Sequence, residues 1–266
     1  MPGIAVVGNL SRDLVDGKAP RPGGPPYWAA RALRALGARA LVVAKCADED
    51  RRMFTRALVP LGLPVLWRPA QATATYAFRY EGDHREMDVL AIGDAWTPED
   101  VRSLGGARWV HAGALAQSDF PAETMAKLAN GRRVSLDGQG LVRPPRTGPL
   151  ELNDGYDPEV LRHVTVLKLS EEEAQALVGE PDEEALRSLG VPEVLVTFGS
   201  RGSLVLADGK LERVPASVID GAADPTGAGD AFAAAYIVSR SSGHAPAAAA
   251  RRASELVAGL LSRRLR

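Results

Sequence analysis

The chain has 266 residues, of which 45% are hydrophobic and 24% charged, and its 32 basic and 33 acidic side chains give a formal net charge of −1. This is the composition of a globular domain, and without an excess of cations it argues against a protein that binds nucleic acid. The single cysteine excludes an internal disulfide, no apolar stretch reaches the ~20 residues that span a bilayer, and the first residues carry no signal-peptide pattern, so we expect a cytoplasmic protein without a membrane partner.

The first sixty residues alternate between strand and helix patterns. A β-branched apolar run predicts a strand at 3–8, and a stretch of Gly, Pro and charge predicts a loop at 13–26. Apolar residues at helical spacing then predict a helix at 27–37, which is followed by a strand at 40–44. Another helix over about 51–59 ends before a proline. Such alternation is typical of a mostly parallel sheet that is covered by helices on both faces.

The stretch 73–91 breaks this rhythm, because it has the pattern of two strands around a Gly82-Asp83 turn. By the period of two, Tyr76, Phe78 and Tyr80 share one face of the hairpin. We expect this aromatic face to be sheet core or a contact between two copies of the chain rather than a ligand site.

A hairpin inserted into a β-α pattern predicts a small sheet that projects from the main domain. We therefore expect one continuous domain over 1–266, with a small lid formed mainly by 12–24 and 72–92. Because an exposed aromatic face needs cover, a homodimer through the lid is the partner hypothesis that follows.

The alternation resumes after the hairpin and continues to the end of the chain. Strands are predicted near 108–112, 133–137, 164–169 and 193–198. A second hairpin at 202–214 turns at Asp208-Gly209. Two Ala-rich helices, at 227–240 and 246–262, complete the predicted α/β fold.

The nine residues 224–232 (DPTGAGDAF) are the most informative stretch of the sequence. Thr226 is a natural N-cap for the helix that follows, and Gly227 and Gly229 leave the backbone uncovered in the first turn. The N–H groups there point outward at the positive end of the helix dipole, where a phosphate is stabilised. Asp230 lies in the same turn, where its carboxylate could accept the proton of an attacking hydroxyl. An anion site beside a base fits phosphoryl transfer to an alcohol.

The same nine residues also fit a purely structural role, as a capped helix with glycines for close packing and an acidic first turn. Other nucleotide-site patterns are excluded: the third glycine of a dinucleotide motif is Phe232 here, and no Gly-Lys pair is followed by Ser or Thr. A protein-kinase catalytic loop is excluded as well, since the only His-Arg pair is followed by Glu86.

Five short motifs follow one another along nearly the whole chain. They are Gly8-Asn-Leu-Ser-Arg-Asp13, Gly23-Gly24 with Leu36-Gly37 behind it, Lys168-Leu-Ser-Glu-Glu-Glu-Ala174, Thr197-Phe-Gly-Ser-Arg-Gly202 and the stretch 224–232. In this combination and order the chain resembles the ribokinase-like (PfkB-type) carbohydrate kinases. The resemblance implies a three-layer α/β sandwich of the ribokinase-like fold with a small β lid. It also implies ATP-dependent transfer of a phosphate to a hydroxyl of a small sugar or polyol, with Mg²⁺.

The resemblance further implies roles for individual residues. The base is Asp230, and the anion hole is formed by Gly227, Ala228 and Gly229. Substrate contacts are implied for Asp13, Gly24 and Trp28. Nucleotide contacts are implied for Lys168, Thr197, Gly199 and Gly202. Metal contacts are implied for Glu173 with magnesium, and for Asp224 and Thr226 with a monovalent cation such as K⁺.

Two positions depart from the family pattern. Ser170 stands where the family's metal-associated segment has Asn, and we expect its shorter hydroxyl to weaken magnesium binding without abolishing it. Trp28 stands where the first signature has a substrate-side Asn, so it offers a flat face to sugar C–H groups or to a base, with core packing as an equal alternative. The acceptor contacts therefore differ from those of a ribose-specific site.

The sequence leaves the phosphate acceptor open between a sugar or polyol and, as the runner-up, a nucleoside, since one fold serves both. A catalytically silent sugar- or nucleotide-binding regulator is a third hypothesis, against which the intact Asp230 and anion hole argue. Asp137, Gln139 and Arg143 follow a predicted strand and could reach the cleft, with a surface loop as an equal alternative. The four histidines lack metal-ligand spacing and are expected to have no role in the site.

Overall fold

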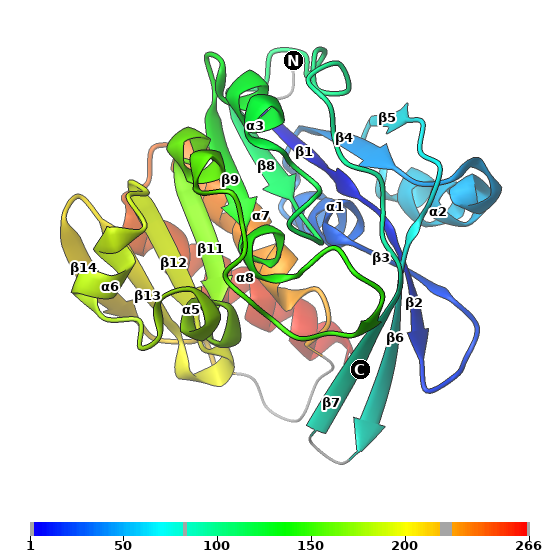
Figure 1. Cartoon of the computed structure of the whole chain (residues 1–266). Helices are drawn as coiled ribbons and strands as arrows, with labels where there is room; N and C mark the ends of the chain where they lie inside the picture. The colour runs from blue at the N-terminus through cyan, green and yellow to red at the C-terminus, as the bar shows by residue number, and fades with distance from the viewer. Residues whose placement is uncertain (1–2, 82–83, 219–224, 265–266) are drawn as a thin grey trace.

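A sheet of nine strands runs through the protein, which a computed structural model describes over residues 3–81, 84–218 and 225–264 (Figure 1). In spatial order the strands are β14 (Lys210–Val214), β13 (Ser203–Ala207), β12 (Glu193–Thr197), β11 (Val166–Ser170), β9 (Arg133–Asp137), β8 (Trp109–Gly113), β1 (Ile4–Asn9), β4 (Ala40–Lys45) and β5 (Val65–Arg68). The strands from β12 to β5 are parallel, and β13 and β14 extend the sheet as an antiparallel hairpin. The carboxyl ends of the parallel strands therefore meet at one edge.

Helices cover both faces of this sheet and make a sandwich of three layers (Figure 1). On one face lie α1 (Pro25–Ala35), α7 (Ala228–Ser241) and α8 (Pro246–Arg264), with α2 (Arg51–Leu58) beside α1. On the other face lie α3 (Ala122–Ala129), α4 (Gln139–Val142), α5 (Glu171–Val178) and α6 (Glu183–Ser188). Short 3₁₀ turns occupy Asp48–Asp50, Val59–Leu61, Pro158–His163 and Gly199–Arg201.

The two cores follow from the alternation of side chains along each strand. In β1, Ile4 and Val6 join the core beneath α1, α7 and α8, while Ala5 and Val7 join the core on the opposite face. Strands buried on both faces read as continuous apolar runs, which is why these segments could be predicted from the sequence. The three-layer α/β arrangement is confirmed.

A second sheet of five strands lies beside the carboxyl edge of the first. Its spatial order is β10 (Gly148–Pro149), β7 (His84–Ala91), β6 (Ala74–Glu81), β2 (Ser11–Val15) and β3 (Arg21–Gly23). The predicted loop at 13–26 is wrong in part, because it contains the end of β2 and all of β3. Strand β2 pairs in parallel with β6, a segment about sixty residues further along the chain, and no local pattern announces that pairing. The predicted Gly82-Asp83 turn lies outside the described residues.

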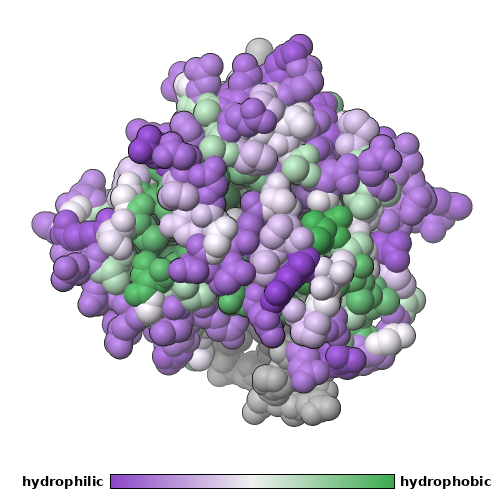
Figure 2. Space-filling view, in the orientation of Figure 1, coloured by the Kyte–Doolittle hydropathy of each residue, from purple (hydrophilic) through white to green (hydrophobic). Residues whose placement is uncertain are grey.

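Most of the other predicted elements agree with the structure. The second hairpin is β13 and β14, and both of its turn residues have positive φ, 49° at Asp208 and 71° at Gly209, as a two-residue hairpin turn requires. The face shown in Figure 2 is largely hydrophilic, and its hydrophobic residues form separate areas rather than one continuous patch. Strands β5 and β10 were not predicted from the sequence.

Candidate active site

A cavity of about 480 Å³ lies between the two sheets, at the carboxyl ends of the parallel strands. Its wall includes nearly all of the residues that the sequence assigned to the site, namely Asp13, Gly24, Trp28, Lys168, Glu173, Thr197, Gly199, Thr226, Gly227, Ala228, Gly229 and Asp230. Gly202 lines an adjoining cavity instead, and Asp224 lies outside the described residues. Segments that are far apart in the sequence thus converge on one space.

Helix α7 opens on the cavity with a turn of unusual backbone conformation. Its N-cap is Gly227, whose φ of +77° is left-handed, and no side chain caps the helix. The predicted N-cap role of Thr226 is therefore wrong: the left-handed glycine makes the turn. The N–H of Ala228 donates to the carbonyl of Pro225 (2.9 Å), whereas the N–H groups of Gly227 and Gly229 donate to no backbone carbonyl among the described residues. Two amides at the positive end of the helix are thus available to an anion.

Asp230 lies in the first turn of α7 and is 7% exposed. Its Oδ1 atom is buried and has no hydrogen-bond partner among the described residues. Burial, followed by the nearby carboxylate of Asp137, raises the pKa of Asp230 to about 8, although Lys168 and Arg143 act in the opposite direction. An unpartnered buried carboxyl of this kind at a cavity wall is typical of an acid–base group.

Lys168 brings a positive charge to the same turn. It extends from β11, is 3% exposed, and its Nζ lies 3.8 Å from Oδ2 of Asp137 on the neighbouring strand β9. Burial alone would lower the pKa of Lys168, but the carboxylates of Asp137, Glu173 and Asp230 outweigh it and hold that pKa above its ordinary value. A Cβ atom on Gly229 would fall 2.8 Å from the Lys168 Nζ, so the ammonium lies directly against the first turn of α7.

Glu173 and Ser170 form the start of α5. The hydroxyl of Ser170 accepts a hydrogen bond from the N–H of Glu173 (3.2 Å), and the Glu173 carboxylate accepts one from the N–H of Ser170 (2.8 Å). Burial raises the pKa of Glu173, which is 6% exposed and still reaches the cavity wall. Ser170 thus serves as a helix cap, a role that the sequence analysis did not assign to it.

Asp13 and the glycine pair after it define the other end of the cavity. The hydroxyl of Ser11 donates to Oδ1 of Asp13 (2.7 Å). A Cβ atom on Gly23 would lie 2.6 Å from Oδ1 of Asp13 and closer still to Oδ2, and one on Gly24 would lie 2.6 Å from the Asn9 carbonyl. Gly24 is therefore required by its close approach to the backbone of residues 9–11, and Gly23 leaves room for the Asp13 carboxylate beside the start of α1.

The aromatic stripe of the second sheet forms a wall of this cavity. Tyr76, Phe78 and Met87 line it from β6 and β7. Tyr76 and Phe78 also pack in the core of the second sheet, as expected from the sequence, so the place in the cavity wall is an addition to that role. The parallel pairing of Asp13 with Tyr76 brings the stripe over the site, and this pairing is what the sequence could not show. Arg143, which follows α4, lies with its guanidinium 5.9 Å from the centre of the Tyr76 ring and also lines the cavity.

A second cavity of about 390 Å³ adjoins the first and shares Thr197, Gly199 and the 228–229 turn with it. Gly202, Phe232, Val257 and Leu261 are among its lining residues, so its wall is largely apolar. The backbone of Gly202 has a φ of +93°, and a Cβ atom there would fall 2.9 Å from the backbone nitrogen of Ala216. Only glycine fits this turn, which forms part of the wall of the second cavity.

A family model described as "pfkB family carbohydrate kinase" matches residues 14–263 of the chain. The chain belongs to the PfkB family of carbohydrate kinases. It is 26% identical over 262 residues to a cytidine kinase of Thermococcus kodakarensis, covering 90% of this chain and 89% of that protein. It is also 26% identical over 264 residues to a ribokinase of Bacillus subtilis, covering 91% and 87% of the two chains.

Among solved structures, a pyrophosphate-dependent kinase of the ribokinase family, complexed with a pyrophosphate analogue and myo-inositol, is similar with a TM-score of 0.85. It is 26% identical in sequence, and the match covers 97% of this chain and 94% of that one. The ribokinase-like fold is thereby confirmed. The PfkB chain is an enzyme that transfers phosphate to an alcohol, and the expected ATP-dependent sugar-kinase activity is the activity of its family.

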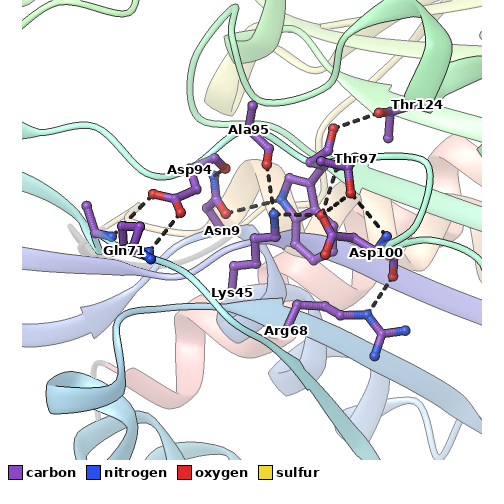
Figure 3. Close-up of polar contacts among 11 residues, drawn as sticks. Asn9, Lys45, Arg68, Gln71, Asp94, Ala95, Thr97, Asp100 and Thr124 are labelled. Atoms are coloured by element: carbon purple, nitrogen blue, oxygen red, sulfur yellow. Dashed lines mark hydrogen bonds and ion pairs between the residues drawn. The ribbon is translucent and has the colours of Figure 1, made fainter.

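A partly buried polar cluster, which was not predicted from the sequence, joins the segments through which this PfkB kinase passes from one sheet to the other (Figure 3). Asn9, at the end of β1, donates to the carbonyl of Asp94 (3.0 Å) and accepts from the indole N–H of Trp96 (3.1 Å). The carboxylate of Asp94 in turn accepts from the N–H groups of Gln71 (2.8 Å) and Ala72 (3.2 Å). One amide and one carboxylate thus tie together the strands that enter and leave the second sheet.

Lys45 fixes the other side of this cluster. From the end of β4, its Nζ donates to the carbonyl of Ala95 (2.7 Å) and lies 2.8 Å from Oδ2 of Asp100 (Figure 3). Burial would raise the pKa of Asp100, but its hydrogen bonds from Lys45 and Thr97 hold that pKa below its ordinary value. The only available signal in the sequence was a polar residue at the end of an apolar strand.

Within the part of the kinase that the structure describes, no helix is both long enough and apolar enough to cross a membrane. The same described residues contain no group of three or more His, Cys, Asp or Glu side chains arranged to hold a metal ion. Magnesium usually binds through one or two carboxylates together with water and substrate phosphates.

Proposed function

We propose that this PfkB kinase transfers the γ-phosphate of ATP to a hydroxyl of a small sugar or polyol, with Asp230 as the base. The observation that carries the proposal is the place of Asp230: its Oδ1 is buried and unpartnered among the described residues, in a helical turn whose free amides face the same cavity. A silent binding protein has no need of a buried carboxyl whose desolvation destabilises the fold.

In this mechanism Asp230 accepts the proton of the acceptor hydroxyl while that oxygen attacks the phosphorus of the γ-phosphate in line with the leaving ADP oxygen. The N–H groups of Gly227 and Gly229 then donate to the transferring phosphoryl group, with Ala228 completing the turn. Lys168 lies against that turn and supplies positive charge as negative charge spreads over the phosphoryl oxygens. These roles of the 227–230 turn and of Lys168 are part of the proposal.

The donor side is assigned to the adjoining cavity. Its apolar wall around Phe232 and Val257 suits the flat face of adenine, and Thr197, Gly199 and Gly202 shape its floor. The buried carboxylate of Glu173, which lines the larger cavity beside it, is an oxygen donor of the kind that magnesium prefers. When bound, magnesium neutralises charge on the donor phosphates. Of the two candidates for contact with a monovalent cation, Thr226 is the one that the structure describes, and it lines the larger cavity.

The acceptor side is assigned to Asp13, Gly24 and the aromatic wall. The Asp13 carboxylate accepts hydrogen bonds from hydroxyls, while Tyr76 and Phe78 offer flat faces to a sugar ring. The same wall favours a nucleoside as the second candidate acceptor, in keeping with the cytidine kinase among the relatives. We further propose that the five-stranded sheet acts as a lid that closes over the acceptor and excludes water.

The test is a matrix of donors and acceptors, with ATP and pyrophosphate as donors and sugars, polyols including myo-inositol, and nucleosides as acceptors. We expect release of ADP from ATP that depends on one acceptor class and on magnesium. Turnover with pyrophosphate but not ATP would overturn the donor assignment, and the similar pyrophosphate-dependent kinase makes that arm necessary. If the protein binds ATP but shows no turnover with any combination of donor and acceptor, that result would support the regulator hypothesis instead.

A further inference from the structure

The indole ring of Trp28 packs directly against the backbone of Gly227. A Cβ atom on Gly227 would fall 2.6 Å from Cε3 of Trp28, and closer still to Cγ and Cδ2. Gly227 is the left-handed N-cap of α7, so the ring lies on the turn that directs the amides of the helix into the cavity. The contact therefore joins α1 to the proposed anion hole.

Trp28 is itself held on a fixed platform. It lies in the first turn of α1, which begins with Pro25 and Pro26. A Cβ atom on Gly8 would fall 3.2 Å from Cγ of Pro26, and one on Gly113 would fall 3.1 Å from Cγ of Pro25, so both prolines sit on the ends of β1 and β8. Prolines at the start of a helix lose little freedom on folding. The ring thus projects from a rigid base.

On the side away from the large cavity, the Trp28 ring has close neighbours. The guanidinium carbon of Arg31 lies 5.2 Å from the centre of the Trp28 ring, and the Tyr27 and Trp28 rings are 4.9 Å apart between centroids. The space that Trp28, Arg31 and Gly227 enclose with helices α7 and α8 is only about 30 Å³. The Trp28 ring can therefore support the Gly227 turn, which it contacts.

We propose that Trp28 is a positioning residue for phosphoryl transfer: it holds the Gly227 turn so that the amides of α7 are aimed at the transferring phosphate. This inference rests on the proposed function, because it requires that the turn binds that phosphate. Hydrogen-bond donors that are held in place around the charge of the transition state raise kcat, because their geometry is set before the reaction. Trp28 acts through Gly227 and does not itself need to touch the reacting atoms.

The first test separates this role from stacking on the acceptor. We expect Trp28→Ala to lower kcat about 10- to 100-fold, a fraction of the loss when an anion-hole donor is removed, and to leave the acceptor KM within about threefold. Trp28→Phe should restore kcat to within about fivefold of the unaltered kinase, since a flat ring remains against Gly227. A raised acceptor KM with unchanged kcat would show that Trp28 is a substrate contact, and unchanged kcat and KM would also overturn the inference.

Trp67→Ala is the matched control for loss of an indole. Trp67 is likewise half-buried and has an arginine, Arg51, 5.4 Å from its ring centre, but it lies on the edge strand β5 and lines neither cavity of the site. Its substitution should lower the melting temperature about as much as Trp28→Ala does and leave kcat unchanged. Equal losses of kcat in the two variants would mean that the effect is merely structural.

A double-mutant cycle tests the contact itself. Gly227→Ala introduces a Cβ atom that collides with the Trp28 ring, and we expect it to lower kcat more than about 100-fold. In the Trp28→Ala background the collision is absent. There we expect the fold-loss of kcat caused by Gly227→Ala to be at least about five times smaller. Gly37→Ala is the matched control, because Gly37 also has a positive φ, +63°, with nothing within 4 Å of the added atom. Additive losses at Trp28 and Gly227 would contradict the inference.

The melting temperatures of the proteins in the double-mutant cycle are also measured by thermal unfolding, which does not depend on activity. Coupling in the melting temperature shows the packing contact, and coupling in kcat shows the positioning role. The proposed function is tested separately, by acceptor-dependent turnover of the unaltered kinase and its loss in Asp230→Asn. If that turnover exists and Trp28→Ala leaves it intact, the inference alone fails.

Discussion

The ammonium group of Lys168 lies 3.8 Å from Oδ2 of Asp137, and the two side chains are 4% and 0% exposed. They extend from paired positions on the adjacent parallel strands β11 and β9. Oδ2 of Asp137 has no hydrogen-bond partner among the described residues, so Lys168 is the charge that compensates it. The same ammonium lies against Gly229, so one buried pair joins the carboxyl edge of the sheet to the first turn of α7.

Replacing Lys168 with Met is expected to lower kcat by about 10²-fold or more, because the positive charge beside the proposed anion hole is lost. It should also reduce the free energy of unfolding by about 3 kcal/mol, since Asp137 is left as an uncompensated buried charge. The double variant Lys168→Met/Asp137→Asn should recover most of that stability in urea unfolding without recovering kcat. A Lys168→Met variant with ordinary turnover would show that the pair is structural only.

The pH dependence of kcat/KM is expected to follow Asp230. The base must be ionised to accept a proton, and burial together with the Asp137 carboxylate raises its pKa to about 8. The value of kcat/KM should therefore rise with pH and level off above about 8, where an unperturbed carboxyl would give a profile that is flat from about pH 5. A profile that is flat between pH 6 and 9 at saturating magnesium would contradict this assignment.

The same shift predicts how stability changes with pH. Between the ordinary carboxyl pKa of 3.8 and about 8, the folded protein keeps a proton on Asp230 that the unfolded chain releases. Folding is therefore opposed more strongly as pH rises through this window. Asp230→Asn removes the effect, so its stability relative to the unaltered protein should increase from pH 4 to pH 8 by a few kcal/mol, at ~1.4 kcal/mol per pKa unit. Chemical denaturation across this range checks the sign, and a constant difference would contradict it.

The aromatic wall is expected to determine the affinity for the acceptor rather than the rate of the chemical step. Phe78→Ala removes a flat face from the proposed acceptor side of the cavity, and we expect the acceptor KM to rise about tenfold with the donor KM unchanged. Met87→Leu, a change of nearly equal volume on the same wall, is the control and should have little effect. A rise in donor KM instead would place the donor, not the acceptor, beneath the second sheet.

Residues 224–232 show how much of this site could be predicted from the sequence. Two glycines and an aspartate in one helical turn predicted amides and a carboxyl at a common surface, and Gly227, Gly229 and Asp230 do line one cavity. The details of the turn differ, since a left-handed Gly227 rather than Thr226 begins the helix. Backbone conformation of that kind depends on what packs on it, here the Trp28 ring from α1.

Long-range pairing explains what the sequence did not reveal. The aromatic stripe at Tyr76 and Phe78 faces the site because β6 pairs in parallel with β2, and local patterns carry no record of a partner about sixty residues away. The same holds for Lys45, whose partners at Ala95 and Asp100 lie beyond the hairpin. Apolar periodicity does locate the strands of a doubly covered sheet, so the main sheet could be predicted while the second was found only in part.

The central claim is that Asp230 is the base, and Asp230→Asn tests it most directly. Asparagine keeps the size of the side chain but cannot accept the proton, so with the acceptor found in the matrix we expect kcat to fall about 10³-fold or more, with the dissociation constant for ATP changed less than about threefold. Asp119→Asn, a buried carboxyl that lies outside both cavities, is the control and should keep its turnover. Turnover preserved in Asp230→Asn, with ATP bound as before, would contradict the account.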